Sequence, residues 1–175
     1  MSLYLAFEIS NEDKKKLENK QIYLKQNAYG DFSDPTTFHI TLIFLSEHKN
    51  QSYLAIKALD LFKEKYNIKP FYVNACNFNR FEQGVEWIGI NDFFPLIQIK
   101  KKMEECLKSV QFNLKKDNYP NYVPHITMGY NIEEYPSLNR QFEEIPILID
   151  NISLWSSIKC NGQHIHNKIY GINFK

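Results

Sequence analysis

The chain contains one tripeptide twice, each time inside a strand-like apolar run: His39-Ile40-Thr41 and His125-Ile126-Thr127. Because successive side chains of a β-strand point to opposite faces, the His and Thr of each copy share one face and the Ile lies on the other. With five His and four Thr in 175 residues, a Thr two places after a His is expected roughly 0.1 times by chance. The repeat therefore predicts two related strands, each presenting a polar pair away from the core.

Each tripeptide belongs to a longer run of the same shape, residues 38–45 for the first copy and 123–130 for the second. The two copies lie about half a chain apart, and a helical pattern precedes each of them. This arrangement predicts two pseudo-equivalent lobes with one His-x-Thr strand each. The residues expected on the buried face of the first run are the alternate apolar ones, Phe38, Ile40, Leu42 and Phe44.

Hydrophobic periodicity over the whole chain predicts an α+β fold. Period-2 alternation marks the strands, while apolar residues at helical spacing mark the helices. The predicted strands are 3–9, 38–45, 71–78, 85–90, 123–130, 147–156 and 168–174, and the predicted helices are 10–26, 55–66 and 95–110. Residues 31–37 are predicted to be a loop, and so is the region of Asn161-Gly162. We interpret His164-Ile165-His166 as part of that exposed loop and not as a metal site.

Two histidines presented by facing strands form the pair that phosphodiester cleavage needs. One imidazole takes a proton from the attacking water or hydroxyl and the other protonates the leaving oxygen, because the pKa of histidine lies near neutrality. The threonine hydroxyls can donate hydrogen bonds to the nonbridging phosphate oxygens, where negative charge gathers in the transition state. This mechanism requires neither a metal ion nor a cofactor. The candidate catalytic residues are His39, Thr41, His125 and Thr127.

These runs resemble the 2H phosphoesterases and, among them, the 2'-5' RNA ligase-like, or RNA 2',3'-cyclic phosphodiesterase, branch. Further similar segments are Tyr4-Leu5-Ala6-Phe7-Glu8-Ile9, Val85-Glu86-Trp87-Ile88-Gly89-Ile90, and Leu154-Trp155-Ser156-Ser157 with Tyr170. The resemblance implies a bilobal α+β fold, in which the antiparallel sheets of two pseudo-symmetric lobes line a central cleft and the helices lie outside. It implies a single domain over residues 1–175, its lobes intertwined in sequence, that cleaves 2',3'-cyclic phosphates or 2'-5' linkages without a metal.

Four aromatic residues are candidate substrate-binding residues. Tyr4 shares a face with Ala6 and Glu8 and could stack on a base, or it is an ordinary surface tyrosine. For the two tryptophans the alternative is packing in the core. Tyr130 stands where RNA-processing members of the family often have a basic residue. The four candidates are Tyr4, Trp87, Tyr130 and Trp155.

The charge of the chain favours a short ligand over a long RNA. Lys and Arg number 21 against 20 Asp and Glu, and the only arginines are Arg80 and Arg140. Because a long RNA backbone is bound through several cationic contacts, we expect a nucleotide or short RNA as the partner.

No run of about 18 apolar residues occurs in the sequence. We therefore expect a cytoplasmic protein without a membrane partner, and favour a monomer.

The sequence thus predicts a metal-independent phosphodiesterase acting on 2',3'-cyclic phosphates or 2'-5' linked nucleotides. By analogy with the family, His125 is the base and His39 the acid, although the sequence does not fix this order. One alternative is a hydrolase of cyclic oligonucleotide immune messengers, acting against host defence. Another is a catalytically silent RNA-binding module that keeps the fold.

Overall fold

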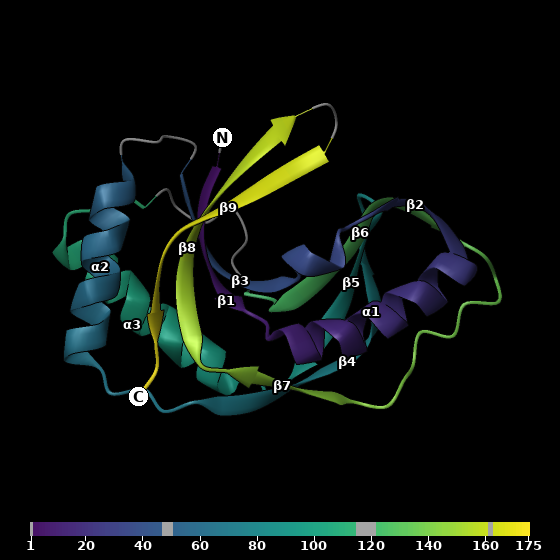
Figure 1. The fold of residues 1–175 in the computed structure, drawn as a ribbon, viewed down its shortest axis with the longest axis horizontal. Coiled ribbons are helices and arrows are strands. Elements are labelled where there is room, and N and C mark those ends of the chain that lie inside the picture. Colours follow the sequence, from purple (N-terminus) through teal and green to yellow (C-terminus); the bar gives the residue numbers. More distant parts are fainter. Residues whose placement is uncertain (1, 47–50, 115–121, 161–162) are drawn as a thin grey trace.

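The computed structural model describes residues 2–46, 51–114, 122–160 and 163–175, which form two antiparallel β-sheets and three α-helices (Figure 1). The predicted α+β class is confirmed. The helices are α1 (Asn11–Gln26), α2 (Ser52–Lys65) and α3 (Phe94–Ser109). The strands are β1 (Ser2–Glu8), β2 (Ala28–Phe32), β3 (His39–Ser46), β4 (Phe71–Phe81), β5 (Val85–Asn91), β6 (His125–Glu134), β7 (Ile145–Ile149), β8 (Asn151–Cys160) and β9 (Gln163–Asn173).

The two His-x-Thr strands lie in different sheets. The first sheet has the strand order β3-β1-β8-β9 and the second has the order β2-β6-β5-β4-β7. Helices α2 and α3 pack together on the outer side of the first sheet, while α1 lies along β7 and β2 of the second (Figure 1). Each sheet therefore carries one motif strand and is covered by its own helices, as the bilobal fold requires. No described helix has the length and apolar character needed to cross a membrane.

Periodicity located the three helices because each has an apolar stripe, and α1 and α3 also have a clear start in the sequence. Helix α1 begins after Ser10, whose hydroxyl accepts a hydrogen bond from the Asp13 N–H at 3.1 Å and so caps the helix. Pro95 lies in the first turn of α3, where no N–H is needed. The buried stripe of α3 consists of Leu96, Ile99, Met103, Cys106 and Leu107.

Three predictions about the strands are wrong. Residues 28–32 form β2 at the edge of the second sheet, a short and mostly polar strand without alternation, and a 3-10 helix spans Pro35–Thr37. The predicted strand 147–156 is two strands, β7 and β8, which belong to different sheets. Strand β9 begins at Gln163, so His166 lies in a strand and not in an exposed loop. The predicted turn at Asn161-Gly162 falls outside the described residues.

Both motif strands carry a one-residue β-bulge directly after the threonine. In β3 the partners of Leu5 and Ala6 are Ile43 and Thr41, so Leu42 is the extra residue. In β6 the partners of Glu86 and Trp87 are Gly129 and Thr127, so Met128 is the extra residue. A bulge of this kind reverses the alternation of the side chains that follow it.

The bulge in β3 corrects the predicted face of one residue. Phe38, Ile40 and Leu42 are buried as expected, but Phe44 is 70% exposed because it falls on the face of His39 and Thr41.

The bulge in β6 is stabilised by a side chain of helix α1. The Gln21 side-chain amide, itself buried, donates hydrogen bonds to the Met128 carbonyl at 2.9 Å and to the Ser33 carbonyl at 2.7 Å. Contacts between distant parts of the chain therefore decide which side chains after each threonine point to the same face of the strand as that threonine.

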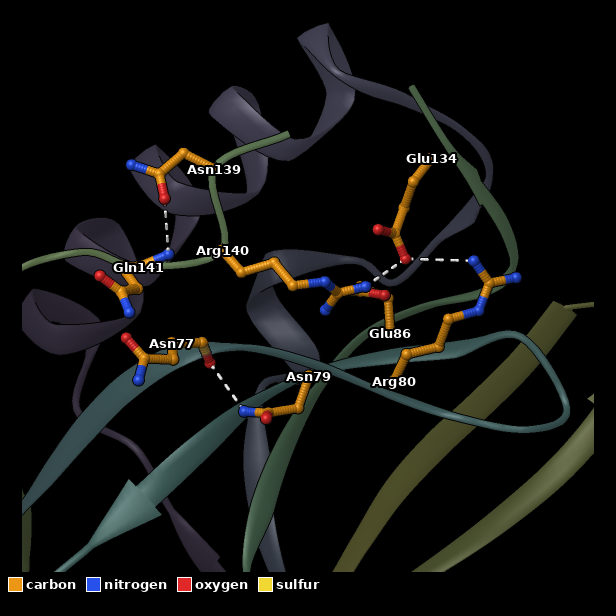
Figure 2. A network of polar contacts seen from close by, with 8 residues as sticks. All are labelled: Asn77, Asn79, Arg80, Glu86, Glu134, Asn139, Arg140 and Gln141. Atoms are coloured by element: carbon orange, nitrogen blue, oxygen red, sulfur yellow. Dashed lines mark hydrogen bonds and ion pairs between the residues drawn. The ribbon is translucent and has the colours of Figure 1, made fainter. Parts of the chain in front are cut away.

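Both arginines of the chain belong to one polar network on the second sheet (Figure 2). Arg140 pairs with the fully buried Glu86 at 3.0 Å and also with Glu134, and Arg80 pairs with Glu134 at 3.1 Å. The second carboxylate oxygen of Glu86 has no hydrogen-bond partner among the described residues. Because Glu86 and Trp87 are consecutive in β5, the network lies on the opposite face of the sheet from Trp87.

Candidate active site

The two motif histidines have the same local hydrogen bond. The Nδ1 atom of His39 lies 2.7 Å from the Thr37 carbonyl oxygen, and the Nδ1 atom of His125 lies 2.7 Å from the Val123 carbonyl oxygen. A carbonyl oxygen only accepts hydrogen bonds, so Nδ1 must carry the proton in both rings. This fixes the tautomer and leaves Nε2 of each ring as the nitrogen that can take up or release a proton.

The fold brings the two motifs together. Strands β3 and β6 are in contact although they belong to different sheets. The Tyr122 hydroxyl, three residues before His125, donates a hydrogen bond of 3.0 Å to the Thr41 carbonyl. This bond ties the entry to the second motif onto the strand of the first. The two histidines are also close enough that the charge of His125 acts on the pKa of His39.

Burial lowers the pKa of both histidines, and it lowers that of His39 further. Desolvation, opposed by the Thr37 hydrogen bond and aided by the charges of His166, His125 and Lys14, brings the pKa of His39 from 6.5 to about 4. For His125, desolvation lowers the pKa and the Val123 hydrogen bond acts the other way. Both rings are therefore neutral near pH 7 in the free protein, each with Nε2 as a proton acceptor.

The threonines of the two motifs occupy equivalent, half-buried positions. Thr41 lies opposite Ala6 in the first sheet, and Thr127 lies opposite Trp87 in the second. The Tyr130 hydroxyl forms a hydrogen bond with the Thr127 side chain, which partly offsets the rise that burial causes in the tyrosine pKa. Each threonine shares the site face of its strand with the histidine two residues earlier.

Because of the bulges, each motif has a third residue on the face of its His and Thr, and the two third residues occupy equivalent positions. Phe44 and Tyr130 each follow the motif threonine by three residues, and each returns to the exposed side of its strand, 70% and 41% exposed respectively. Sequence reasoning found Tyr130 but missed Phe44. Aligning the two octapeptides places Phe44 beside Tyr130, and this alignment is the signal that could have found it.

On the second sheet, aromatic rings surround His125. The Trp87 ring centroid lies 5.5 Å from that of His125 and stacks on Phe81 at 4.8 Å, while Phe81 meets His125 edge-on at 5.2 Å. The Trp87 indole N–H is buried, and no described residue accepts a hydrogen bond from it. Trp87 therefore lies beside His125, and its indole N–H has no hydrogen-bond acceptor among the described residues.

On the first sheet, Tyr4 lies beside His39 but is not an open stacking surface. Its ring centroid is 5.2 Å from that of His39 and 5.9 Å from that of Phe44, and the residue is only 3% exposed. The expectation that it presents a free face to a base is thus wrong, because neighbouring rings cover it. Trp155 pairs with Tyr4 across β1 and β8, and no described residue accepts its buried indole N–H.

A third histidine, which sequence reasoning assigned to a loop, lies at the site. His166 projects from β9, its Nδ1 atom lies 2.7 Å from the Tyr4 hydroxyl oxygen, and its ring centroid is 5.7 Å from that of His39. No local signal could have found it, since Tyr4 and His166 are 162 positions apart. Only the pairing of β8 with β1 and β9 brings them together.

Two lysines lie around His39 and its cross-strand partner Glu8. Lys168 pairs with Glu8, which also accepts a hydrogen bond from the Ser153 hydroxyl. Burial alone would raise the pKa of Glu8, but these partners hold it below its ordinary value. Lys14 donates a hydrogen bond of 2.6 Å to the Thr36 carbonyl. Among the described residues, no three His, Cys, Asp or Glu side chains gather as metal ligands.

Comparison with known proteins supports the family resemblance over most of the chain. Residues 16–159 match the family model described as the 2'-5' RNA ligase superfamily. No curated protein is similar enough in sequence to be matched.

Solved structures show the same fold at low sequence identity. The apo structure of LigT from E. coli has a TM-score of 0.77 at 18% identity, covering 99% of this chain and 96% of that one. TT0787 of Thermus thermophilus has a TM-score of 0.79 at 13% identity, covering 99% and 98%. The MHV ns2 PDE domain has a TM-score of 0.59 at 11% identity, covering 87% and 96%. The bilobal fold predicted for this chain is therefore confirmed.

Proposed function

The chain belongs to the 2'-5' RNA ligase superfamily of 2H phosphoesterases, and from this membership we propose that it is a phosphodiesterase for 2',3'-cyclic phosphates or 2'-5' linkages in short nucleotides. One observation carries the proposal. Two imidazoles lie close together, each held through Nδ1 by a backbone carbonyl and each followed by a threonine on the same face. This set supplies a base, an acid and two donors for a phosphate.

The burial of the two rings favours one assignment of their roles. His39, whose pKa falls to about 4, is the better candidate for the base because it stays neutral over the widest pH range. Its Nε2 takes the proton of the attacking water, while Nε2–H of a protonated His125 gives a proton to the leaving ribose oxygen. This order is the reverse of the one that the family resemblance implies.

The remaining site groups suit the phosphate and the nucleoside. The hydroxyls of Thr41 and Thr127 can donate to the nonbridging oxygens, where they act without reorganisation. Phe44 and Tyr130 expose ring surface beside the two motifs, and aromatic surfaces of this kind stack on bases of any sequence. Solved relatives carry 3'-AMP, ATP and NADP+ as ligands, as the structures of LigT are described.

A short substrate fits the charge of the site better than a long RNA. Arg80 and Arg140 are both engaged with carboxylates on the other face of the second sheet from Trp87. Lys14 acts on the pKa of His39, and Lys168 is paired with Glu8, the cross-strand partner of His39. Strong binding of an RNA backbone needs several cationic contacts to phosphates, and the described residues around the site offer few.

A panel of substrates in the presence of EDTA tests the proposal. The panel holds 2',3'-cyclic mononucleotides, a short RNA ending in a 2',3'-cyclic phosphate, 2'-5' oligoadenylate and 3'-5' cyclic dinucleotides. We expect cleavage of the first three, measured by chromatography of the products. Cleavage of the cyclic dinucleotides alone would favour the immune-messenger alternative. Binding of RNA with no turnover of any substrate would favour the silent module.

The pH dependence of kcat/KM follows from the pKa values of the free protein. The base must be neutral, so activity rises as the pH increases through the lowered pKa of His39, about 4. The acid must be protonated, so activity falls as the pH increases through the pKa of His125, which lies below its ordinary 6.5. We expect a bell-shaped profile with its maximum below pH 6.5.

The profile is measured on a 2',3'-cyclic mononucleotide, whose single phosphate charge does not titrate in this range. A maximum above pH 8, or a rate that changes in one direction only, would contradict the two-histidine mechanism.

A further inference from the structure

His166 lies at the site without belonging to either motif. Its ring meets Tyr4 edge-on, with the ring centroids 5.9 Å apart and the planes at 88°, and its Nδ1 atom bonds to the Tyr4 hydroxyl at 2.7 Å. Tyr4 itself contacts the rings of His39 and Phe44. The orientation of the His166 ring is therefore set by contacts and is not that of a side chain in a loop.

His39 is influenced by two further imidazoles. The ring centroids of His166 and His39 are 5.7 Å apart, and the charges of both His166 and His125 act on the pKa of His39. His166 and His39 come from strands of the first sheet, whereas His125 comes from the second. A phosphate bound between His39 and His125 would therefore have His166 on the side of the first sheet.

The chemistry of the Tyr4–His166 pair suits an anion. Burial raises the pKa of Tyr4 well above its ordinary value, so the hydroxyl keeps its proton and can donate it to Nδ1 of a neutral His166. The N–H of that ring is then at Nε2, and the imidazolium form also has an N–H there. In either form His166 offers an N–H donor at Nε2, which matches a phosphate oxygen.

We infer that His166 binds the phosphate next to the scissile one, so that the preferred substrate is an oligonucleotide and not a mononucleotide. The inference rests on the proposed function, because it places the scissile phosphate between His39 and His125. Phe44, 70% exposed and 5.9 Å from Tyr4, lies beside this second subsite. A base stacked on Phe44 would belong to the nucleotide that joins the two phosphates.

Two substrates that differ by one nucleotide test the inference. They are adenosine 2',3'-cyclic phosphate and the diadenylate that ends in the same cyclic phosphate, which has one more phosphodiester. We expect His166→Ala to lower kcat/KM about 10-fold on the diadenylate, since hydrogen bonds to charged groups are strong, and less than twofold on the mononucleotide. Asn167→Ala is the matched control, because Asn167 is the exposed neighbour on the opposite face of β9.

Binding of the two products gives a readout that needs no turnover. By calorimetry, we expect the wild-type protein to bind the diadenylate with a terminal 3'-phosphate more tightly than adenosine 3'-phosphate. His166→Ala should remove most of this preference, and Asn167→Ala should keep it. If the wild-type protein cleaves nothing, the proposed function fails, and these affinities still decide the role of His166.

Equal losses on the two substrates would overturn the inference, because His166 would then act through His39 or the scissile phosphate. The absence of any loss on either substrate would overturn it as well. Thermal unfolding of His166→Ala and Asn167→Ala shows whether a loss comes from a damaged sheet. In that case His166→Phe, which keeps a ring at this position but has no N–H donor, replaces His166→Ala in the same comparison.

Discussion

Replacing His39 or His125 with alanine is expected to lower turnover by about 10²- to 10⁴-fold, because each ring supplies one proton transfer in the transition state. Both rings are largely buried and bonded to a carbonyl, so the protein must also be shown to remain folded. Turnover of a 2',3'-cyclic nucleotide and the circular dichroism of each variant are the measurements. A variant that keeps more than a tenth of the wild-type rate would exclude its histidine as acid or base.

A second substrate distinguishes the two variants and so shows which histidine is the acid and which is the base. An aryl nucleotide ester releases a nitrophenolate that needs no proton from the enzyme. If His125 is the acid, His125→Ala should keep much of its activity on this ester while His39→Ala stays inactive. The opposite result would restore the order that the family resemblance implies.

Removing the guanidinium of Arg140 is expected to cost about 3 kcal/mol of unfolding free energy, measured by urea denaturation at pH 7. Glu86 is fully buried and Arg140 is its paired cation at 3.0 Å. Without Arg140, Glu86 is buried either as an uncompensated charge or in the protonated form, and at pH 7 both are more costly than loss of an exposed pair. Arg140 is itself partly exposed, so the value lies at the lower end of that range.

Arg80 provides the matched control. It pairs with Glu134 at 3.1 Å, as Arg140 also does, whereas the buried Glu86 has Arg140 as its cation. Arg80→Ala should therefore cost less than about 1 kcal/mol, as exposed ion pairs do. The double variant Glu86→Gln/Arg140→Ala should be more stable than Arg140→Ala alone. Equal costs for Arg80→Ala and Arg140→Ala would show that burial of Glu86 does not decide the effect.

The loss of unfolding free energy in Arg140→Ala should change with pH in a direction that the pKa of Glu86 determines. Burial raises the pKa of Glu86 above its ordinary 4.5, although Arg140 acts in the other direction. A group whose pKa is raised in the folded state contributes stability that is complete below its ordinary pKa and is lost as the pH rises. Loss of Arg140 raises this pKa further. The cost of Arg140→Ala should thus be smaller at pH 5 than at pH 7.

Much of the fold follows from short-range patterns in the sequence. The three helices were predicted because capping residues and apolar stripes are local, and the two motif strands were predicted because their alternation is regular up to the threonine. The predicted catalytic set also lies together, since each His-x-Thr pair is read from one strand. These features depend on residues that are neighbours in the chain.

What the sequence did not reveal depends on partners that are distant in the chain. The face of Phe44 is decided by a bulge that is visible only in the pairing of β3 with β1. The place of His166 is decided by its bond to Tyr4. Strand β2 has no pattern of its own and forms on the edge of β6. The prediction that Tyr4 is open to a base failed because its neighbouring rings come from other parts of the chain.

The strand order of the first sheet bears on when the protein becomes active during synthesis. β1 lies between β3 and β8, and β9 completes the sheet. The first strand therefore cannot pair with one of its two neighbours until β8, Asn151–Cys160, has left the ribosome. Pairings of such long separation close slowly. A nascent chain that already carries both His-x-Thr motifs still lacks Trp155 and His166, so we expect the complete site to form only after β8 and β9 have been synthesised.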